Sequence, residues 1–143
     1  MFVMYTVSCE SHFDAAHFLV NYPGACKNIH GHRWRVRVSV SAPELIDSGA
    51  ARGMVVDFTE IKKVLRELTG RFDHKLIIET DSLRSTTKLM LEEEEAEYIE
   101  VDFRPTAECF AKYFYDEIKS GGIVPSAVRV YESDETFAEY CGE

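Results

Sequence analysis

The stretch HRWRVRVSVSA, residues 32–42, alternates between two kinds of side chain, which is typical of a half-buried β-strand. Trp34 and the three valines after it share one parity, whereas arginines and serines occupy the other. Successive side chains of a strand point to opposite faces of its sheet. The alternation therefore predicts a long strand with one face buried against apolar groups and one polar face.

An upstream stretch, FVMYTVSCESHFDAAHF at residues 2–18, alternates more loosely and predicts a second strand beside the first. The residues of one parity are mostly apolar: Val3, Tyr5, Val7, Cys9, Phe13 and Ala15. His17 has this same parity, provided that no bulge shifts the strand.

Two amphipathic helices are predicted after the strands. Asp57 is expected to cap the first, in which apolar residues recur at helical spacing over residues 61–68. Thr106 is expected to cap the second, within RPTAECFAKYFYDEIKS at residues 104–120. A shorter helix is predicted within residues 83–96.

Additional short strands are predicted around the helices, and SAVRVYESDETFAEY at residues 126–140 is expected to supply the last strand. MVVDF at residues 54–58 and YIEVDF at residues 98–103 have strand-like composition. This order of elements predicts an α+β fold, with an antiparallel sheet and helices on one of its faces.

The composition fits one domain over residues 1–143, since hydrophobic residues make up 45% of the chain. The formal net charge of −9 disfavours nucleic-acid binding, although a local basic pocket can still receive an anionic small molecule. The four cysteines form no C-x-x-C pair, and the N-terminal stretch holds no long apolar block. We therefore expect a cytoplasmic protein with free thiols and no membrane association.

The sequence CKNIHGH, residues 26–32, places two histidines two positions apart. Residues i and i+2 of a strand point to the same side, so His30 and His32 can reach one metal ion. His17, at the end of the neighbouring strand, is the natural third ligand. Three neutral imidazoles suit Zn²⁺ and leave a fourth position open for catalysis. The H-x-H pattern alone is also common in ordinary strands.

Cys26 and the adjacent pair Asp73 and His74 are candidates for acid–base chemistry. Cys26 has three interpretations: a zinc ligand, a thiolate near the metal that acts as base or nucleophile, or a small buried hydrophobe. An acid beside an imidazole can orient it for proton transfer. The same pair also occurs as ordinary polar groups at the end of a helix.

Together these features resemble the 6-pyruvoyl-tetrahydropterin synthase and 6-carboxytetrahydropterin synthase family. The resemblance covers residues 3–140, and its motifs are, in order, FDAAHF, CKNIHGHRW, MVVDF, FDHKLI, PTAECFAKY and VYESDET. It implies the tunnelling fold (T-fold), in which a four-stranded antiparallel sheet carries two helices on one face and subunits join into a barrel. It also implies a homohexamer of two trimers, with active sites at subunit interfaces.

The resemblance implies roles for individual residues. The matching positions form three groups: zinc ligands His17, His30 and His32; catalytic residues Cys26, Asp73 and His74; and pterin-binding residues Glu132, Thr106 and Glu108. A buried carboxylate such as that of Glu132 can accept the row of N–H donors that a pterin presents. Thr106 and Glu108 also fit an N-cap and a first-turn acid, and both interpretations can hold at once.

The substrate that the resemblance implies is 7,8-dihydroneopterin triphosphate. The three-residue gap between Cys26 and HGH, with no glutamate in it, resembles the branch that makes 6-carboxy-5,6,7,8-tetrahydropterin for queuosine and other deazapurines, releasing acetaldehyde and triphosphate. Two alternatives stay open: a 6-pyruvoyl-tetrahydropterin synthase, and a non-catalytic protein that binds a pterin or purine. The stretch 79–103 is longer than in compact family members and could reshape the pocket rim.

Overall fold

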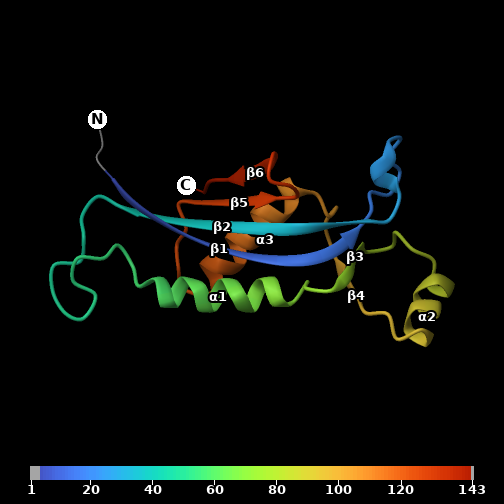
Figure 1. The fold of residues 1–143 in the computed structure, drawn as a ribbon, viewed down its shortest axis with the longest axis horizontal. Coiled ribbons are helices and arrows are strands. Elements are labelled where there is room, and N and C mark those ends of the chain that lie inside the picture. Colours follow the sequence, from blue (N-terminus) through green and yellow to red (C-terminus); the bar gives the residue numbers. More distant parts are fainter. Residues whose placement is uncertain (1–3, 143) are drawn as a thin grey trace.

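The computed structural model describes residues 4–142 and confirms the α+β fold class (Figure 1). β1 (Tyr5–His17) and β2 (His30–Ala42) form a long antiparallel pair, and their register is unbroken over all 13 residues of each strand. No bulge intervenes, so the predicted parity of β1 extends to His17. Val3, which was assigned to the same face, lies outside the described residues.

The sheet contains six strands in the order β4-β3-β1-β2-β5-β6, two more than the four predicted. The remaining strands are β3 (Lys75–Glu79), β4 (Tyr98–Val101), β5 (Ala127–Tyr131) and β6 (Phe137–Tyr140). β5 and β6 continue the sheet beyond β2 in antiparallel fashion. β3, however, runs parallel to both β1 and β4, so the prediction of a purely antiparallel sheet is wrong.

The parallel pairing of β3 with β4 follows from the stretch 79–103. Parallel neighbours require a long crossover connection, and α2 (Ser85–Glu93) lies within that connection. A helix in this region was predicted from the sequence, but it adds a third helix to the two that the resemblance implied. In Figure 1, α2 stands clear of the main body beyond β3 and β4, and none of its residues is fully buried.

The two predicted amphipathic helices are α1 (Phe58–Gly70) and α3 (Ala107–Ser120), and both contribute to one core on the same face of the sheet. The side chain of Asp57 caps α1, and that of Thr106 caps α3, each by accepting a hydrogen bond from a first-turn backbone N–H. Such caps each contribute about 1 kcal/mol to helix stability. No helix within residues 4–142 combines the length and the apolar composition needed to cross a membrane.

An aromatic core fills the space between the sheet and these helices. Phe13 on β1 and Trp34 on β2 are fully buried, and their nearly parallel rings lie 5.8 Å apart. Phe110 of α3 packs against both rings. Burial of each such side chain stabilises the fold by about 2–3 kcal/mol. Trp34, at the edge of this core, also contacts His17 at the end of β1 and His32 near the start of β2.

The segment between β2 and α1 is a loop, so the strand predicted over residues 54–58 is wrong. The N–H of Ile46 donates to the carbonyl of Met54, and the N–H of Gly53 donates to the carbonyl of Ile46. These local bonds occupy backbone groups that a neighbouring strand would need.

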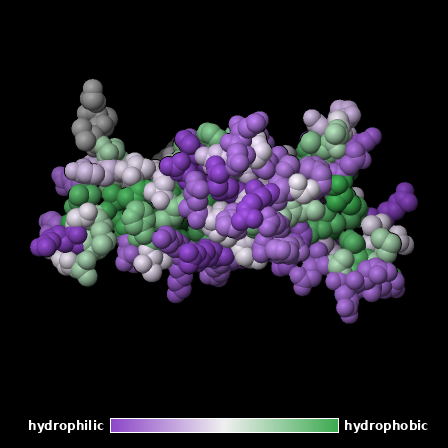
Figure 2. All heavy atoms as spheres, in the orientation of Figure 1, coloured by the Kyte–Doolittle hydropathy of each residue, from purple (hydrophilic) through white to green (hydrophobic). Residues whose placement is uncertain are grey.

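Large apolar side chains remain exposed at this end of the molecule. They form a surface that we call the end patch: Tyr5, Leu45, Ile46, Met54 and Phe58. Figure 2 shows hydrophobic residues gathered at the left end, where Figure 1 places this loop, and a depression of about 270 Å³ lies among them. Exposed apolar patches on soluble proteins often mark contact surfaces.

Candidate active site

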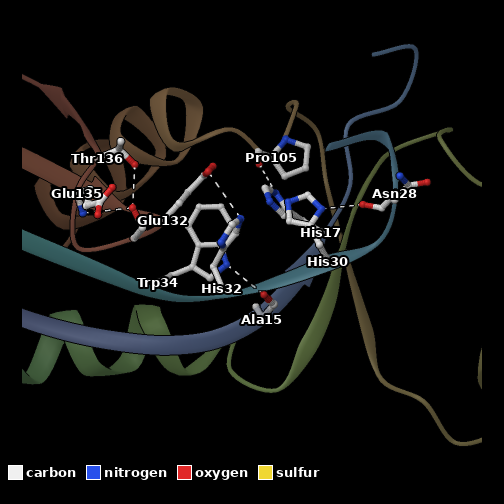
Figure 3. Close-up of polar contacts among 11 residues, drawn as sticks. Ala15, His17, Asn28, His30, His32, Trp34, Pro105, Glu132, Glu135 and Thr136 are labelled. Carbon is white, nitrogen blue, oxygen red and sulfur yellow. Dashed lines mark hydrogen bonds and ion pairs between the residues drawn. The ribbon is translucent and has the colours of Figure 1, made fainter. Parts of the chain in front are cut away.

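Three histidines converge where β1 ends and β2 begins. His17 pairs directly with His30 across the two strands, and His32 follows two residues later on the same face. Each of the three offers a ring nitrogen, and these nitrogens all lie within 4.8 Å of one another. Figure 3 shows the three rings clustered beside Trp34. The unbroken register therefore produces the predicted triad.

Backbone carbonyls fix the orientation of two of the rings. Nδ1 of His17 lies 2.7 Å from the carbonyl oxygen of Pro105, and Nδ1 of His30 lies 2.7 Å from that of Asn28 (Figure 3). A carbonyl oxygen can only accept, so Nδ1 carries the proton in each ring and Nε2 presents its lone pair. Metal-bound histidines are commonly oriented by such bonds.

The unpaired nitrogens fit a metal ion. Nε2 of His17 and Nε2 of His32 are buried and have no hydrogen-bond partner among the described residues. Buried polar atoms without a partner are costly and rare in native proteins, so they call for an explanation. Three imidazole nitrogens facing a common point match the ligand set of a catalytic zinc, which leaves one position free for substrate.

The environment favours the neutral, metal-binding form of two of these rings, His17 and His32. Burial lowers the pKa of His17 to about 4, and the neighbouring His30 and His32 act in the same direction, against an opposing effect of the Pro105 hydrogen bond. The pKa of His32 is also lowered, first by burial and then by His30. Trp34 packs edge-on against His17 and His32, with ring centroids 4.8 and 5.4 Å away, and excludes water from that side.

Glu132, which follows β5, lies beside the triad. Its Oε2 is 3.7 Å from Nε2 of His32. Burial and then the negative charge of Glu108 raise its pKa. Glu132 and Glu108 also line a common cavity of about 120 Å³ with Thr136. The structure thus brings two of the three predicted pterin-binding residues together at the edge of the histidine cluster.

The third of these residues, Thr106, acts as the N-cap of α3. Its Oγ1 accepts a hydrogen bond from the N–H of Cys109 at 3.2 Å. The capping interpretation is therefore confirmed. Thr106 directly follows Pro105, whose carbonyl holds His17, so the start of α3 contributes to the frame of the site.

Cys26 lies in a short 3-10 turn, η1 (Ala25–Lys27), in the loop between β1 and β2. It is exposed, so its interpretation as a small buried hydrophobe is wrong. Among residues 4–142, the group that could hold a metal contains the three histidines and not Cys26. The same loop supplies the Asn28 carbonyl that orients His30.

Asp73 and His74 form a fixed pair on a turn after α1. Oδ2 of Asp73 lies 2.9 Å from Nδ1 of His74, and Oδ1 accepts a hydrogen bond from the N–H of Asp14. This backbone bond, followed by the interaction with His74, lowers the pKa of Asp73. The N–H of His74 in turn donates to the Asp14 carbonyl at 2.7 Å, and its φ of 60° is a left-handed conformation that these bonds hold in place.

This acid–base pair does not meet the histidine triad within one chain. No hydrogen bond or ion pair among residues 4–142 joins the two groups. The side chain of His74 is 78% exposed and borders an open depression of about 550 Å³, which His32 of the triad also lines, together with Asp14 and Arg33.

Comparison with known proteins identifies the family. A family model described as 6-pyruvoyl tetrahydropterin synthase matches residues 6–143. The chain belongs to the 6-pyruvoyl tetrahydropterin synthase family. One relative of this chain is the 6-carboxy-5,6,7,8-tetrahydropterin synthase of Haemophilus influenzae. The two are 32% identical over 140 residues, which cover 96% of this chain and 99% of that protein. The protein of the same name from Aquifex aeolicus is 34% identical, covering 80% and 75%.

Solved structures confirm the family's tunnelling fold. An uncharacterized protein from Wolinella succinogenes superposes with a TM-score of 0.80 at 21% identity, covering 99% of both chains. The 6-pyruvoyl tetrahydropterin synthase of Plasmodium falciparum gives a TM-score of 0.72 at 19% identity, covering 96% of both chains. That of Caenorhabditis elegans gives 0.69 at 22% identity, covering 99% of this chain and 98% of the other.

Proposed function

We propose that this protein is a zinc-dependent lyase that converts 7,8-dihydroneopterin triphosphate to 6-carboxy-5,6,7,8-tetrahydropterin, acetaldehyde and triphosphate, on a route to queuosine-type deazapurines. The observation that carries the proposal is the triad of His17, His30 and His32, with its inward-facing nitrogens, in a member of this family. The names of the relatives from Haemophilus influenzae and Aquifex aeolicus support the carboxy product. The atoms balance when one water molecule is consumed.

The residues of the site have separate tasks in this proposal. Bound to the triad, zinc would supply Lewis-acid polarisation of the substrate's side-chain hydroxyl groups. Glu132 accepts hydrogen bonds from the pterin ring and so sets where the substrate's side chain lies, and Glu108 and Thr106 are further pterin-binding residues in this proposal. The Sγ atom of Cys26 takes a proton from the side-chain carbon.

His74 relays a second proton in this proposal, while Asp73 holds its Nδ1 and leaves Nε2 to exchange protons. The 2.9 Å contact between their side chains and the backbone bonds to Asp14 support this arrangement, because they fix the direction of the ring.

A second subunit would complete the site. Among the described residues, the pair of Asp73 and His74 forms no hydrogen bond or ion pair with the triad, and we propose that a neighbouring chain brings such a pair to the substrate. The exposed end patch and the two edge strands β4 and β6 offer surfaces for such assembly. We therefore include a homohexamer of two trimers in the proposal, with sites at the interfaces and one domain per chain over residues 1–143.

Exposed thiols at Cys26 and Cys141 support a reducing, cytoplasmic location. The partner is a small pterin triphosphate rather than a nucleic acid or a membrane, in keeping with the net charge of −9. The family model itself is named for the 6-pyruvoyl activity, and this observation favours 6-pyruvoyl-tetrahydropterin formation as the second candidate.

Metal removal tests the proposed zinc dependence. Protein stripped with a chelator should lose turnover of 7,8-dihydroneopterin triphosphate and regain it when one equivalent of Zn²⁺ per chain is added. Circular dichroism should show that the stripped protein stays folded, because an aromatic core and not the metal holds the sheet and helices together. Full turnover in demonstrably metal-free protein would overturn the zinc-dependent lyase proposal.

Subunit mixing tests the shared site. The variants Cys26→Ala and His74→Ala should each be inactive alone. Co-assembled in equal amounts, they should recover about a quarter of wild-type activity, because random assembly joins an intact Cys26 from one chain with an intact His74 from another in that share of sites. No recovery in verified mixed oligomers would mean that both groups act within one chain.

A further inference from the structure

Arg104 contacts the loop that carries Cys26. We call residues 18–29, which join β1 to β2, the thiol loop. Nη2 of the half-buried Arg104 donates to the carbonyl oxygen of Val20 at 3.2 Å, and its guanidinium lies 5.7 Å from the centre of the Tyr22 ring. The connection from β4 to α3 therefore touches the first half of this loop.

Contacts within the thiol loop connect the residues that Arg104 touches to Cys26. A Cβ atom on Gly24 would lie 2.7 Å from the Tyr22 ring, so the ring packs directly on the backbone there and only glycine permits the approach. The N–H of Leu19 donates to the carbonyl of Cys26 at 2.8 Å, and this bond joins the two halves of the loop. The thiol-bearing residue is thus held to the same end of the loop that Arg104 binds.

Phe18, the first residue of the thiol loop, is buried, but few hydrogen bonds join the loop to other elements. Its remaining backbone hydrogen bonds are internal to the loop. The carbonyl of Asn28 accepts a hydrogen bond from Nδ1 of His30 on the flanking strand β2. Among the described residues, Arg104 makes the one hydrogen bond that joins the loop to an element other than its flanking strands. A hydrogen bond from a charged donor is stronger than a neutral one, so its loss should release the loop.

We propose that Arg104 is a positioning residue that holds the thiol loop, and with it Cys26, in a fixed position relative to the histidine triad. Arg104 directly precedes Pro105, whose carbonyl orients His17. The same two-residue segment therefore fixes the loop and one histidine of the triad relative to each other. This inference rests on the proposed catalytic role of Cys26.

Three variants of the full-length, zinc-loaded protein test this inference. Arg104→Ala removes the donor, Arg104→Lys keeps a single charged donor, and Arg52→Ala removes an exposed arginine from the distant loop before α1. In Arg104→Ala, kcat should fall by about 10–100-fold because the thiol is misplaced, while KM and zinc content stay near wild type. Arg104→Lys should recover most of the loss, and Arg52→Ala should match wild type.

Hydrogen exchange of the Leu19 amide gives a readout that does not depend on turnover. Its protection should fall in Arg104→Ala and stay unchanged in Arg52→Ala. Unchanged protection in Arg104→Ala would overturn the inference, and so would lost protection with an unchanged kcat, or a loss of kcat that merely follows lost zinc. If the wild type shows no turnover, the proposed function fails on its own, and the exchange data still decide whether Arg104 holds the loop.

Discussion

Acid should destabilise the metal-free protein through His17, whose side chain is almost fully buried with a pKa lowered to about 4. In the unfolded chain a histidine titrates near its ordinary value of about 6.5. Above that pH the ring is neutral in both states, and the fold keeps its full stability. As the pH falls below about 6.5, the unfolded chain takes up a proton that the folded chain refuses, so the free energy of unfolding decreases until the pH approaches 4.

The size of this effect follows from the difference between the two pKa values. At about 1.4 kcal/mol per pKa unit, His17 accounts for a loss of about 3 kcal/mol of unfolding free energy between pH 6.5 and 4. His32, whose pKa is also lowered, acts in the same direction. A loss of this size is a substantial fraction of the stability of a typical domain.

Urea unfolding of the chelator-treated protein, followed by circular dichroism from pH 7.5 to 4, measures the effect. His17→Asn is the matched variant, because the asparagine N–H₂ can still donate to the Pro105 carbonyl but cannot take up a proton. Over this range the free energy of unfolding of the wild type should fall by about 3 kcal/mol more than that of the variant. Parallel pH profiles for the two proteins would refute the reasoning that burial keeps His17 neutral.

Three other substitutions, one of them with a control variant, have expected outcomes. Cys26→Ala should retain one zinc per chain, measured by atomic absorption, but lose about 10²–10⁴-fold in turnover, whereas Cys141→Ala at the exposed C-terminal end should match wild type. Glu132→Gln should weaken pterin binding by about 10-fold or more in calorimetry, since a carboxylate that pairs with ring N–H donors is replaced by an amide with only one acceptor oxygen. Thr106→Ala should lower the free energy of unfolding by about 1 kcal/mol in urea titrations, through loss of the α3 cap; an unchanged midpoint would contradict the capping role.

The histidine triad could be predicted from the sequence because it depends on strand parity and on a pairing of neighbouring strands without a bulge. His30 and His32 share a face by spacing, and His17 joins them because the register of β1 and β2 is unbroken. The carbonyls of Asn28 and Pro105, which orient two of the rings, left no signal in the sequence, because any residue carries a carbonyl and only the tertiary fold brings it to the ring.

The errors in the predicted fold come from long-range pairing. β3 is only five residues long, and its parallel neighbours could not be inferred, because nothing local shows that α2 serves as the crossover between β3 and β4. The strand expected at residues 54–58 has strand-like composition, but the backbone of its first residue, Met54, is already bonded within the loop, to Ile46 and Ala51. Composition predicted which segments form helices and strands better than it predicted which strands pair with each other.

The most direct test of the proposed function is product analysis. The zinc-loaded protein is incubated with 7,8-dihydroneopterin triphosphate, and the pterin product and released aldehyde are identified by mass spectrometry. The proposal predicts 6-carboxy-5,6,7,8-tetrahydropterin together with equimolar acetaldehyde and triphosphate. Accumulation of 6-pyruvoyl-tetrahydropterin without acetaldehyde would contradict the carboxy assignment, and the absence of any turnover with zinc bound would contradict the assignment as an enzyme.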